Sequence, residues 1–378
     1  MKKIITDCRI VTDGKILDGA DIVVEDKKIT ALVPKGSVSG EKISLNGNFI
    51  SAGFIDIHCH GGDGAEFIDG TVEAVKRACA IHKKHGTRVI YPTLSASDTA
   101  TVVKALEAIE KAADESEIII AGVHLEGPYL SAQMCGGQDP DSVRAPDENE
   151  YKMLYERFGN LIKRWTYAPE NDDENFVKFL KENKIVPSMG HTAAEYCHVK
   201  SAFDGGCELV THLYSCTSTV TRKGGFRSLG VIESAFLIKD MFVEAIADGK
   251  HLPPELLKMI VDIKGAKRVC LITDAIRPGG LGEEFDGKEY TDCPVPFVIE
   301  DGVAKLIDRS AFAGSIATAD ILLKTAVSAG ISLPDSVRML TETPADVMKL
   351  DGFGRIADGY NAVFTVFDEN LNIVNDII

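Results

Sequence analysis

The pattern of apolar and polar positions divides the chain into two β-rich ends and a long middle. Near the start, apolar runs around Ile4 and Ile10, and then over residues 21–26 and 28–33, are separated by turn residues, which is typical of short strands. Residues 362–368 near the other end repeat this pattern. We therefore expect a small β-sandwich domain assembled from both termini, residues 1–52 plus 350–378, beside a larger domain over residues 53–349.

The middle of the chain alternates apolar segments with amphipathic ones. Strands are expected at residues 54–58, 88–92, 118–125, 165–168, 185–188, 209–212, 243–247 and 269–273, and helices at residues 71–85, 98–113, 172–183, 193–203 and 253–263. Asp98 is expected to cap the second of these helices. This order predicts an α/β fold, the (β/α)8 TIM barrel, although a doubly wound sheet has a similar order of elements. Residues 283–310, with two Asp-Gly turns, are interpreted as a hairpin inserted after the eighth strand.

Composition narrows the choice of partners. The 378 residues, 45% of them hydrophobic, suffice for one large barrel and a small accessory domain. The net charge of −16 argues against nucleic acid and against anionic membranes as partners. An anionic substrate would therefore need a local basic pocket rather than general attraction.

The start of the chain and the cysteines bear on the compartment. Two lysines follow Met1 without a long apolar run, and no segment approaches the ~20 apolar residues of a membrane span. The nine cysteines include no C-x-x-C pair, and an odd number in a long chain is typical of reduced thiols. We expect a cytoplasmic protein.

His58 and His60 form the strongest local signal for chemistry. They end the first expected barrel strand, and alternate residues of a strand point to the same face, with Cα atoms about 6–7 Å apart. Both imidazoles can then reach one ion at ~2.1 Å. Taken alone, the pair is also compatible with two ordinary polar residues at a strand end.

Four further residues also lie at the carboxyl ends of expected barrel strands. Glu126, His191, His212 and Asp274 each follow an expected apolar strand, namely the third, fifth, sixth and eighth. In a closed barrel the carboxyl ends of all strands meet at one mouth. Each residue alone is compatible with a capping or core role, but their convergence with His58 and His60 predicts a metal site.

The donor types indicate which ion the site binds and what it does. Imidazoles and carboxylates suit a divalent ion such as Zn²⁺ or Fe²⁺. The residues allow one or two ions per subunit, and Glu126 would bridge the ions if two are bound. Such an ion lowers the pKa of bound water and polarises a carbonyl. Asp274 is the natural general base and acid, taking a proton from water and returning it to a leaving amine.

Several other polar residues lie near the expected mouth. Arg222, Lys223 and Arg227 occupy a Gly-containing loop after the sixth strand, which is a candidate anion clamp or an ordinary surface loop. His251 follows the seventh strand and faces the mouth, unless it only begins the next helix. His124 is expected to support the site from behind rather than to bind metal.

Three other histidines, His82, His85 and His198, fall in helical segments and are expected to be solvated or to cap helices.

Taken together, these residues resemble the amidohydrolase superfamily and, within it, the N-acetylglucosamine-6-phosphate deacetylases. The similar segments extend over nearly the whole chain: residues 53–60, HLEGP at 124–128, GHT at 190–192, THLY at 211–214, ADGKH at 247–251, TDA at 273–275 and AGS at 313–315. Members of this family remove the acetyl group of a phosphorylated amino sugar, which gives acetate and glucosamine 6-phosphate.

The resemblance implies roles for the candidate residues. It implies a TIM barrel with a small β-sandwich, with Glu126, His191 and His212 as core metal ligands and Asp274 as the catalytic acid and base. Members that keep the H-x-H pair bind a second ion there. The resemblance further implies a homodimer in which the sugar phosphate is held by the histidine at 251 and by an arginine of the neighbouring subunit. Arg227 fits the setting of that arginine best, and Arg222 is the second choice.

The chain departs from the family in the part that binds substrate. Ser215, Cys216 and Thr217 replace an N-A-M segment whose groups normally face the phosphate, and Gln138 stands where some members have a histidine near the acetyl carbonyl. Ala313 and Gly314 belong to a similar segment and are expected to line the substrate site. Another N-acyl amino sugar, such as N-acetylgalactosamine 6-phosphate, therefore stays open as the substrate.

Two other functions were weighed. Cyclic-amide hydrolases bridge two metals with a carboxylated lysine on the fourth strand, and residues 165–169 contain no lysine. A non-catalytic barrel used as a scaffold would be expected to have lost metal ligands, and all six are present.

Overall fold

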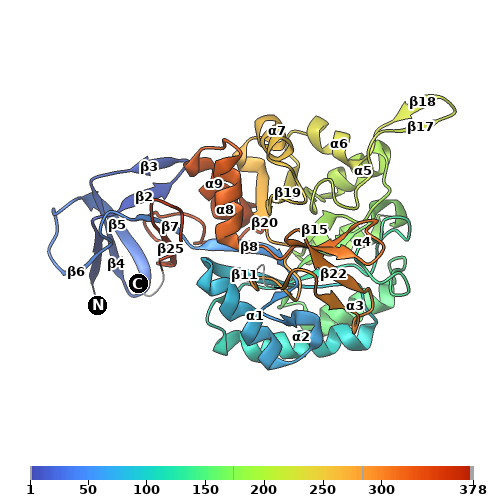
Figure 1. The fold of residues 1–378 in the computed structure, drawn as a ribbon, viewed down its shortest axis with the longest axis horizontal. Helices are drawn as coiled ribbons and strands as arrows, with labels where there is room; N and C mark the ends of the chain where they lie inside the picture. Colours follow the sequence, from blue (N-terminus) through green and yellow to red (C-terminus); the bar gives the residue numbers. More distant parts are fainter. Residues whose placement is uncertain (1, 173, 283–284, 375–378) are drawn as a thin grey trace.

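The computed structural model describes residues 2–172, 174–282 and 285–374, and the parts of our predictions that fall on residues 1, 173, 283–284 and 375–378 lie outside this range. Within it, the two ends of the chain form two four-stranded sheets, in the orders β5-β4-β1-β6 and β25-β7-β2-β3. Figure 1 shows β25, from the red end of the chain, among the blue strands of the start. The strands are β1 (Lys3–Thr6), β2 (Arg9–Thr12), β3 (Lys15–Leu17), β4 (Ala20–Glu25), β5 (Lys28–Pro34), β6 (Glu41–Ser44), β7 (Phe49–Ala52) and β25 (Phe364–Phe367).

The two sheets share one apolar core. Ile5 and Ile22 from one sheet pack with Ile10, Ile50 and Val366 from the other, and all five are buried. Because alternate residues of these short strands are apolar, each sheet has one face that must be covered. The predicted small domain built from both termini is confirmed as an architecture, while its boundaries stay a prediction.

The larger part is a barrel of parallel strands. In the described part of the chain these are β8 (Phe54–Cys59), β11 (Thr87–Leu94), β13 (Val123–Glu126), β14 (Ile162–Tyr167), β15 (Val186–Met189), β16 (Leu209–Val210), β19 (Phe242–Ile246) and β20 (Val269–Ile272). Neighbours in sequence are neighbours in space, with short β12 (Ile119–Ile120) leading into β13. The last strand meets the first just beyond its end, where Asp274 N donates to His58 O (2.9 Å) and His60 N donates to Ala275 O (2.8 Å). The TIM barrel is thereby confirmed over the doubly wound sheet.

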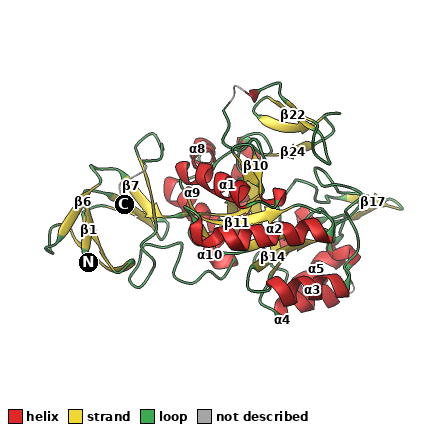
Figure 2. Cartoon of the chain, turned by 90° about the horizontal axis from the view of Figure 1, so that it is seen from below, coloured by secondary structure: helices red, strands yellow, loops and turns green. Residues whose placement is uncertain are grey.

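Helices surround the barrel (Figure 2). The α-helices of the described residues are α1 (Val72–Lys84), α2 (Thr99–Ala112), α3 (Glu148–Phe158), α4 (Asn175–Glu182), α5 (Tyr196–Gly205), α6 (Val231–Leu237), α7 (Pro254–Lys264), α8 (Ala319–Ser328), α9 (Leu333–Leu340) and α10 (Glu342–Val347). The five predicted helices correspond to α1, α2, α4, α5 and α7, and Asp98 caps α2 by accepting from Thr101 N (3.0 Å). Helices α3, α6 and α8–α10 were not predicted from the sequence.

Single turns of 3₁₀-helix occur at Phe67–Asp69, Ala113–Glu115, Pro169–Asn171 and Ala266–Arg268. None of the helices among the described residues combines the length and the apolar character that a membrane span needs.

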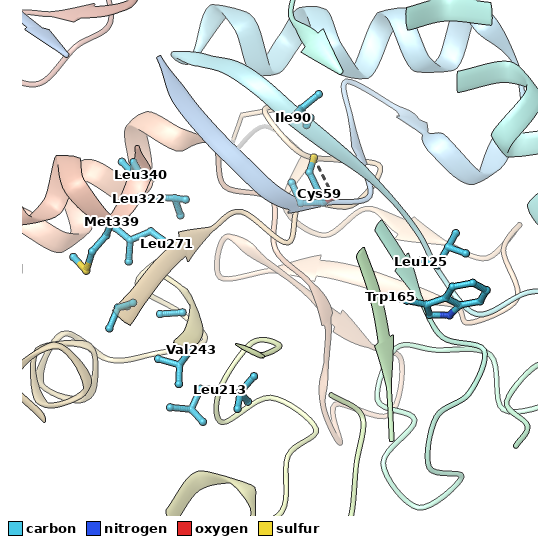
Figure 3. Packing of buried hydrophobic residues seen from close by; sticks show 14 of the residues in the cluster. Cys59, Ile90, Leu125, Trp165, Leu213, Val243, Leu271, Leu322, Met339 and Leu340 are labelled. Carbon is cyan, nitrogen blue, oxygen red and sulfur yellow. Dashed lines mark hydrogen bonds between the residues drawn. The ribbon is translucent and has the colours of Figure 1, made fainter. Parts of the chain in front are cut away.

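The apolar layer between strands and helices holds the barrel together. Trp165 on β14 and Leu125 on β13 face this layer, as do Leu322 on α8 and Met339 on α9 (Figure 3). All four side chains are buried. This packing fixes the strands, and so it fixes the ends of the strands, where the polar residues lie.

Two smaller pieces extend from the barrel. The predicted hairpin over residues 283–310 is wrong in detail, because β21 (Glu289–Tyr290), β22 (Phe297–Glu300), β23 (Val303–Leu306) and β24 (Phe312–Gly314) form a four-stranded antiparallel sheet. Figure 2 shows β22 and β24 projecting from the barrel, apart from the terminal sheets. The second piece is a hairpin of β17 (Thr221–Lys223) and β18 (Phe226–Ser228), which projects furthest from the body in Figure 1. A further short pair, β9 (Gly61–Gly62) and β10 (Ala65–Glu66), follows β8.

Candidate metal centre and active site

The six predicted metal ligands meet at one end of the barrel. His58 belongs to β8 and Glu126 ends β13, while His60, His191, His212 and Asp274 follow β8, β15, β16 and β20. All six residues are buried, with at most 9% of their surface exposed. The convergence that the strand ends predicted is therefore present in the fold.

The donor atoms are spaced like those of a metal site. The Nε2 atoms of His58 and His60 lie 3.3 Å apart, and those of His191 and His212 lie 3.2 Å apart. Glu126 lies between the pairs, with Oε1 2.8 Å from His212 Nε2 and Oε2 3.1 Å from His60 Nε2. Four donors at ~2.1 Å from one ion in a tetrahedron are about 3.4 Å apart, so the arrangement fits bound divalent ions.

Asp274 closes the group on the side of the H-x-H pair. Its Oδ1 atom lies 3.3 Å from Nε2 of His58 and 3.3 Å from Nε2 of His60. About 12% of its side chain is exposed, against 0% for His58, so Asp274 can be reached from outside the barrel. A carboxylate in this position is able both to contact an ion and to exchange protons with water.

Hydrogen bonds on the outer ring nitrogens turn the histidines toward the centre. His191 Nδ1 donates to Met134 O (2.9 Å) and His212 Nδ1 donates to Ser215 O (3.0 Å). Because a carbonyl only accepts, each Nδ1 carries a proton, and each ring directs its Nε2 atom toward the centre. Such outer partners are what metal-binding histidines require.

The backbone is strained at three of the six residues. His191, His212 and Asp274 have φ angles of 46°, 29° and 46°, in the left-handed region that residues with a side chain rarely adopt. Strain of this kind costs about 1–3 kcal/mol per residue and gathers at functional sites. It brings each side chain sharply inward just after its strand ends.

Charge within the group keeps both carboxylates ionised. Burial by itself raises the pKa of Asp274, but His58 and His60 outweigh burial and hold that pKa at about 2. Burial also acts on Glu126, where His58 and His191 outweigh it and leave the pKa well below its ordinary value. Both carboxylates are therefore available as anionic ligands for a cation.

A cavity of about 1080 Å³ opens above the centre. His60, Glu126, His191, His212 and Asp274 form part of its wall. The predicted substrate residues Gln138, Ser215, Cys216, His251, Ala313 and Gly314 also line it. The structure thus brings these six residues to the same cavity as the metal donors, with the inserted sheet contributing to the wall through residues such as Lys288 and Phe312.

Gln138 and His251 are each held by a specific partner. Gln138 Nε2 donates to Glu126 Oε2 (2.6 Å), and Gln138 Oε1 accepts from Ala96 N (2.8 Å). His251 Nδ1 lies 2.7 Å from Asp248 Oδ2. Both side chains are therefore fixed before any ligand arrives.

The two candidate arginines lie elsewhere. Arg222 and Arg227 are cross-strand partners on the β17–β18 hairpin, both are exposed, and neither belongs to the wall of the cavity. Within one chain the structure does not bring them to the metal donors.

Sequence reasoning missed residues that support the centre. Glu244 contacts His58 and the backbone of His212, Arg164 pairs with Glu244, and Ser95 Oγ lies 3.0 Å from His60 Nδ1. One signal was available, because Glu244 is a charged residue in the apolar strand FVEAI. His124, expected to support the site, is buried between Thr93 and Thr166.

The fourth strand and His82 differ from the predictions. The fourth strand begins at Ile162 rather than at residue 165, so it does contain a lysine, Lys163. Since Arg164 and Thr166 contact Ser188 inside the barrel, the alternation of the strand directs Lys163 to the other face. His82 is not solvated but fully buried, with Nε2 donating to Gly61 O (2.8 Å).

The chain's similarity to known proteins agrees with this fold and site. Residues 49–378 match the amidohydrolase family. An N-acetylglucosamine-6-phosphate deacetylase of Bacillus subtilis (strain 168) is 32% identical over 311 residues, which cover 79% of this chain and 78% of the relative. An N-acetylgalactosamine-6-phosphate deacetylase of Shewanella sp. (strain ANA-3) is 29% identical, and the alignment covers 97% of this chain and 92% of the Shewanella protein.

A solved structure resembles the whole chain. It is a mutant N-acetyl-D-glucosamine-6-phosphate deacetylase of Mycobacterium smegmatis in complex with N-acetyl-D-glucosamine-6-phosphate, with a TM-score of 0.89 and 26% identity. The alignment covers 99% of this chain and 96% of the other. A TIM barrel with histidines and carboxylates gathered at the strand ends defines a hydrolase of the metal-dependent type. The chain belongs to the amidohydrolase family.

Proposed function

We propose that this protein hydrolyses the acetamide of N-acetylglucosamine 6-phosphate to acetate and glucosamine 6-phosphate. The observation that carries the proposal is the meeting of Glu126, His191, His212 and Asp274 at a cavity whose wall also holds His251. The relatives named above act, by their names, on N-acetylated hexosamine phosphates.

The metal centre takes Zn²⁺ or Fe²⁺, one or two ions per subunit. Glu126, His191 and His212 hold the core ion, and His58 and His60 hold the second. When bound, such an ion lowers the pKa of water and polarises the amide carbonyl.

The protein's own groups move the proton and hold the substrate. Asp274, ionised and open to the cavity, accepts a proton from the attacking water and returns it to the leaving nitrogen. Gln138, fixed between Glu126 and Ala96 N, stands beside the acyl group. His251 faces the phosphate from within the chain, near the wall formed by Ser215, Cys216, Ala313 and Gly314.

The phosphate also needs a positive partner besides His251. We infer a cytoplasmic homodimer in which the β17–β18 hairpin of one subunit reaches the cavity of the other. Arg227 is the first candidate for the contact with phosphate, and Arg222 is the second. Both extend from a projecting hairpin, which supports this assignment (Figure 1).

The test is acetate release. The purified chain, loaded with Zn²⁺ or Fe²⁺, is expected to release acetate and a free amine from N-acetylglucosamine 6-phosphate in equal amounts, and to do so far more slowly with unphosphorylated N-acetylglucosamine. A fully metallated protein that releases no acetate from the phosphorylated sugar would refute the proposal.

N-acetylgalactosamine 6-phosphate is the second candidate substrate. It is favoured by the 29% identity to the Shewanella enzyme over nearly the full chain and by the unusual segment Ser215–Cys216–Thr217 at the cavity. The ratio of kcat/KM for the two sugar phosphates, measured side by side, decides between them.

A further inference from the structure

A buried ion pair lies inside the barrel beneath the metal donors. Arg164 on β14 and Glu244 on β19 have no exposed surface, and Arg164 Nη1 donates to Glu244 Oε1. The guanidinium has further fixed acceptors, with Nη1 3.1 Å from Ile57 O, Nε 3.0 Å from Ser188 Oγ and Nη2 2.9 Å from Thr211 Oγ1. Arg164 is therefore held by residues of β8 and β15 and by Thr211 just after β16, and it holds Glu244 in turn.

The other oxygen of Glu244 contacts two of the metal ligands. Glu244 Oε2 accepts from His58 Nδ1 (3.1 Å) and from the backbone N of His212 (3.1 Å). An ionised carboxylate only accepts, so His58 Nδ1 carries a proton, and the ring directs Nε2 toward Asp274 and Glu126, 3.3 and 3.4 Å away. One side chain thus sets the ring of His58 and the start of the turn that carries His212.

Among the described residues, His58 has a charged acceptor on its outer ring nitrogen, whereas the three other histidines of the centre have neutral partners there. His60 is held by the hydroxyl of Ser95, and His191 and His212 are held by backbone carbonyls. A charged acceptor makes an imidazole a stronger donor to a metal than a neutral acceptor does. The strongest support in the centre is therefore given to His58, the first histidine of the H-x-H pair.

We propose that Glu244, fixed by Arg164, is a positioning residue that retains the ion held by His58 and His60. This inference rests on the proposed function, because it takes the six donors to be a metal centre. It goes beyond that function in naming the side chains that retain the second ion.

The alternative is that the ion pair only stabilises the fold. Removing one member of a buried pair leaves an uncompensated charge and destabilises the protein, whereas replacing both members with apolar side chains is often tolerated. The double variant Arg164→Met/Glu244→Leu therefore separates the two roles. A matched control is Arg338→Met/Glu342→Leu, which removes the well-buried pair between α9 and α10 (3.0 Å), away from the metal donors.

The experiment measures metal content and affinity rather than activity. Each full-length protein is loaded with Zn²⁺, dialysed against a buffered free Zn²⁺ concentration, and assayed for ions per chain and for loss of Zn²⁺ to a chelator. The wild type and the Arg338/Glu342 control are expected to hold two ions per chain. Arg164→Met/Glu244→Leu is expected to hold one ion tightly, with affinity for the other lowered by roughly 10- to 100-fold.

Glu244→Gln provides a second variant that keeps the shape and an acceptor oxygen but removes the charge, and the same loss of one ion is expected. A folded variant of either kind, with the wild-type circular dichroism spectrum, that retains two ions at wild-type affinity would overturn the inference. A wild type that holds one ion also overturns it, while leaving acetate release free to succeed. A wild type that holds none removes the metal basis of the proposed function itself.

Discussion

Nδ1 of His251 lies 2.7 Å from Oδ2 of Asp248, three residues earlier in the same turn. Asp248 Oδ1 accepts from the backbone N of both Lys250 and His251, each at 2.8 Å, so the carboxylate is itself fixed. The ring of His251 packs against Phe312 of the inserted sheet, with 4.8 Å between the ring centroids. The imidazole is therefore set in one orientation, with its second nitrogen left for a ligand in the cavity.

Replacing Asp248 with asparagine should weaken the binding of the sugar phosphate. The amide side chain keeps the turn but no longer supplies the charged acceptor that holds His251 Nδ1, and a hydrogen bond to a charged group is worth about 1.5–3 kcal/mol. We expect KM for N-acetylglucosamine 6-phosphate to rise roughly tenfold with little change in kcat. Turnover of the unphosphorylated sugar is the control, and an equal loss there would show that the variant disturbs the site as a whole.

Replacing Asp274 with asparagine tests the proton carrier. Loss of a positioned general base typically lowers the rate roughly 100- to 10,000-fold. We expect kcat for acetate release to fall by that amount, while the ion held by Glu126, His191 and His212 is retained. Steady-state kinetics and metal analysis on the same preparation check both statements, and loss of the core ion would mean that Asp274 acts mainly as a ligand.

The sequence made the centre predictable because its logic is local. A strand places His58 and His60 on one face, and Glu126, His191, His212 and Asp274 each follow an apolar run, so a barrel alone suffices to bring them together. Arg164 and Glu244 could not be paired in the same way, because they are 80 positions apart and their contact depends on which residues face the barrel interior. Glu244 was visible only as a charge in an apolar strand.

The fold was predictable to the same extent and for the same reason. Periodicity identified the barrel strands. The order of strands in the inserted sheet instead depends on the pairing of β24 with β23. Just after β24, Ser315 forms a bridge with Ala275 of the barrel. His82 was misjudged because the helix that carries it turns this residue toward Gly61 and the backbone after β8. Contacts of that kind follow from packing between elements, which a pattern within one element does not contain.

The origin of the arginine that contacts phosphate is testable by mixing variants. If Arg227 serves the neighbouring subunit, then Arg227→Ala and Asp274→Asn are each nearly inactive alone, but a mixed dimer contains one site with both residues intact. We expect acetate release to reappear when the two proteins are unfolded together and refolded as a mixture. Arg222→Ala alone distinguishes the two arginines, because it should keep its activity if Arg227 makes the contact. Absence of recovery in the mixture would show that Arg227 does not serve the neighbouring subunit.

The buried histidine of α1 should make the protein sensitive to acid. His82 has no exposed surface, and burial holds its pKa at about 4, against 6.5 for an exposed histidine. Between these values the unfolded chain binds a proton that the folded chain does not, so stability is lost as pH falls from about 6.5 to 4, by roughly 3 kcal/mol.

His82→Gln keeps a donor for Gly61 O without a titrating group. We therefore expect the stability of the variant to fall less than that of the wild type as the pH is lowered from 7.5 to 4, by roughly 3 kcal/mol. The measurement is the urea midpoint of unfolding of both proteins at each pH. Metal is removed beforehand, so that loss of metal in acid does not contribute to the difference. Two curves that stay parallel over this range would show that His82 does not supply the acid sensitivity.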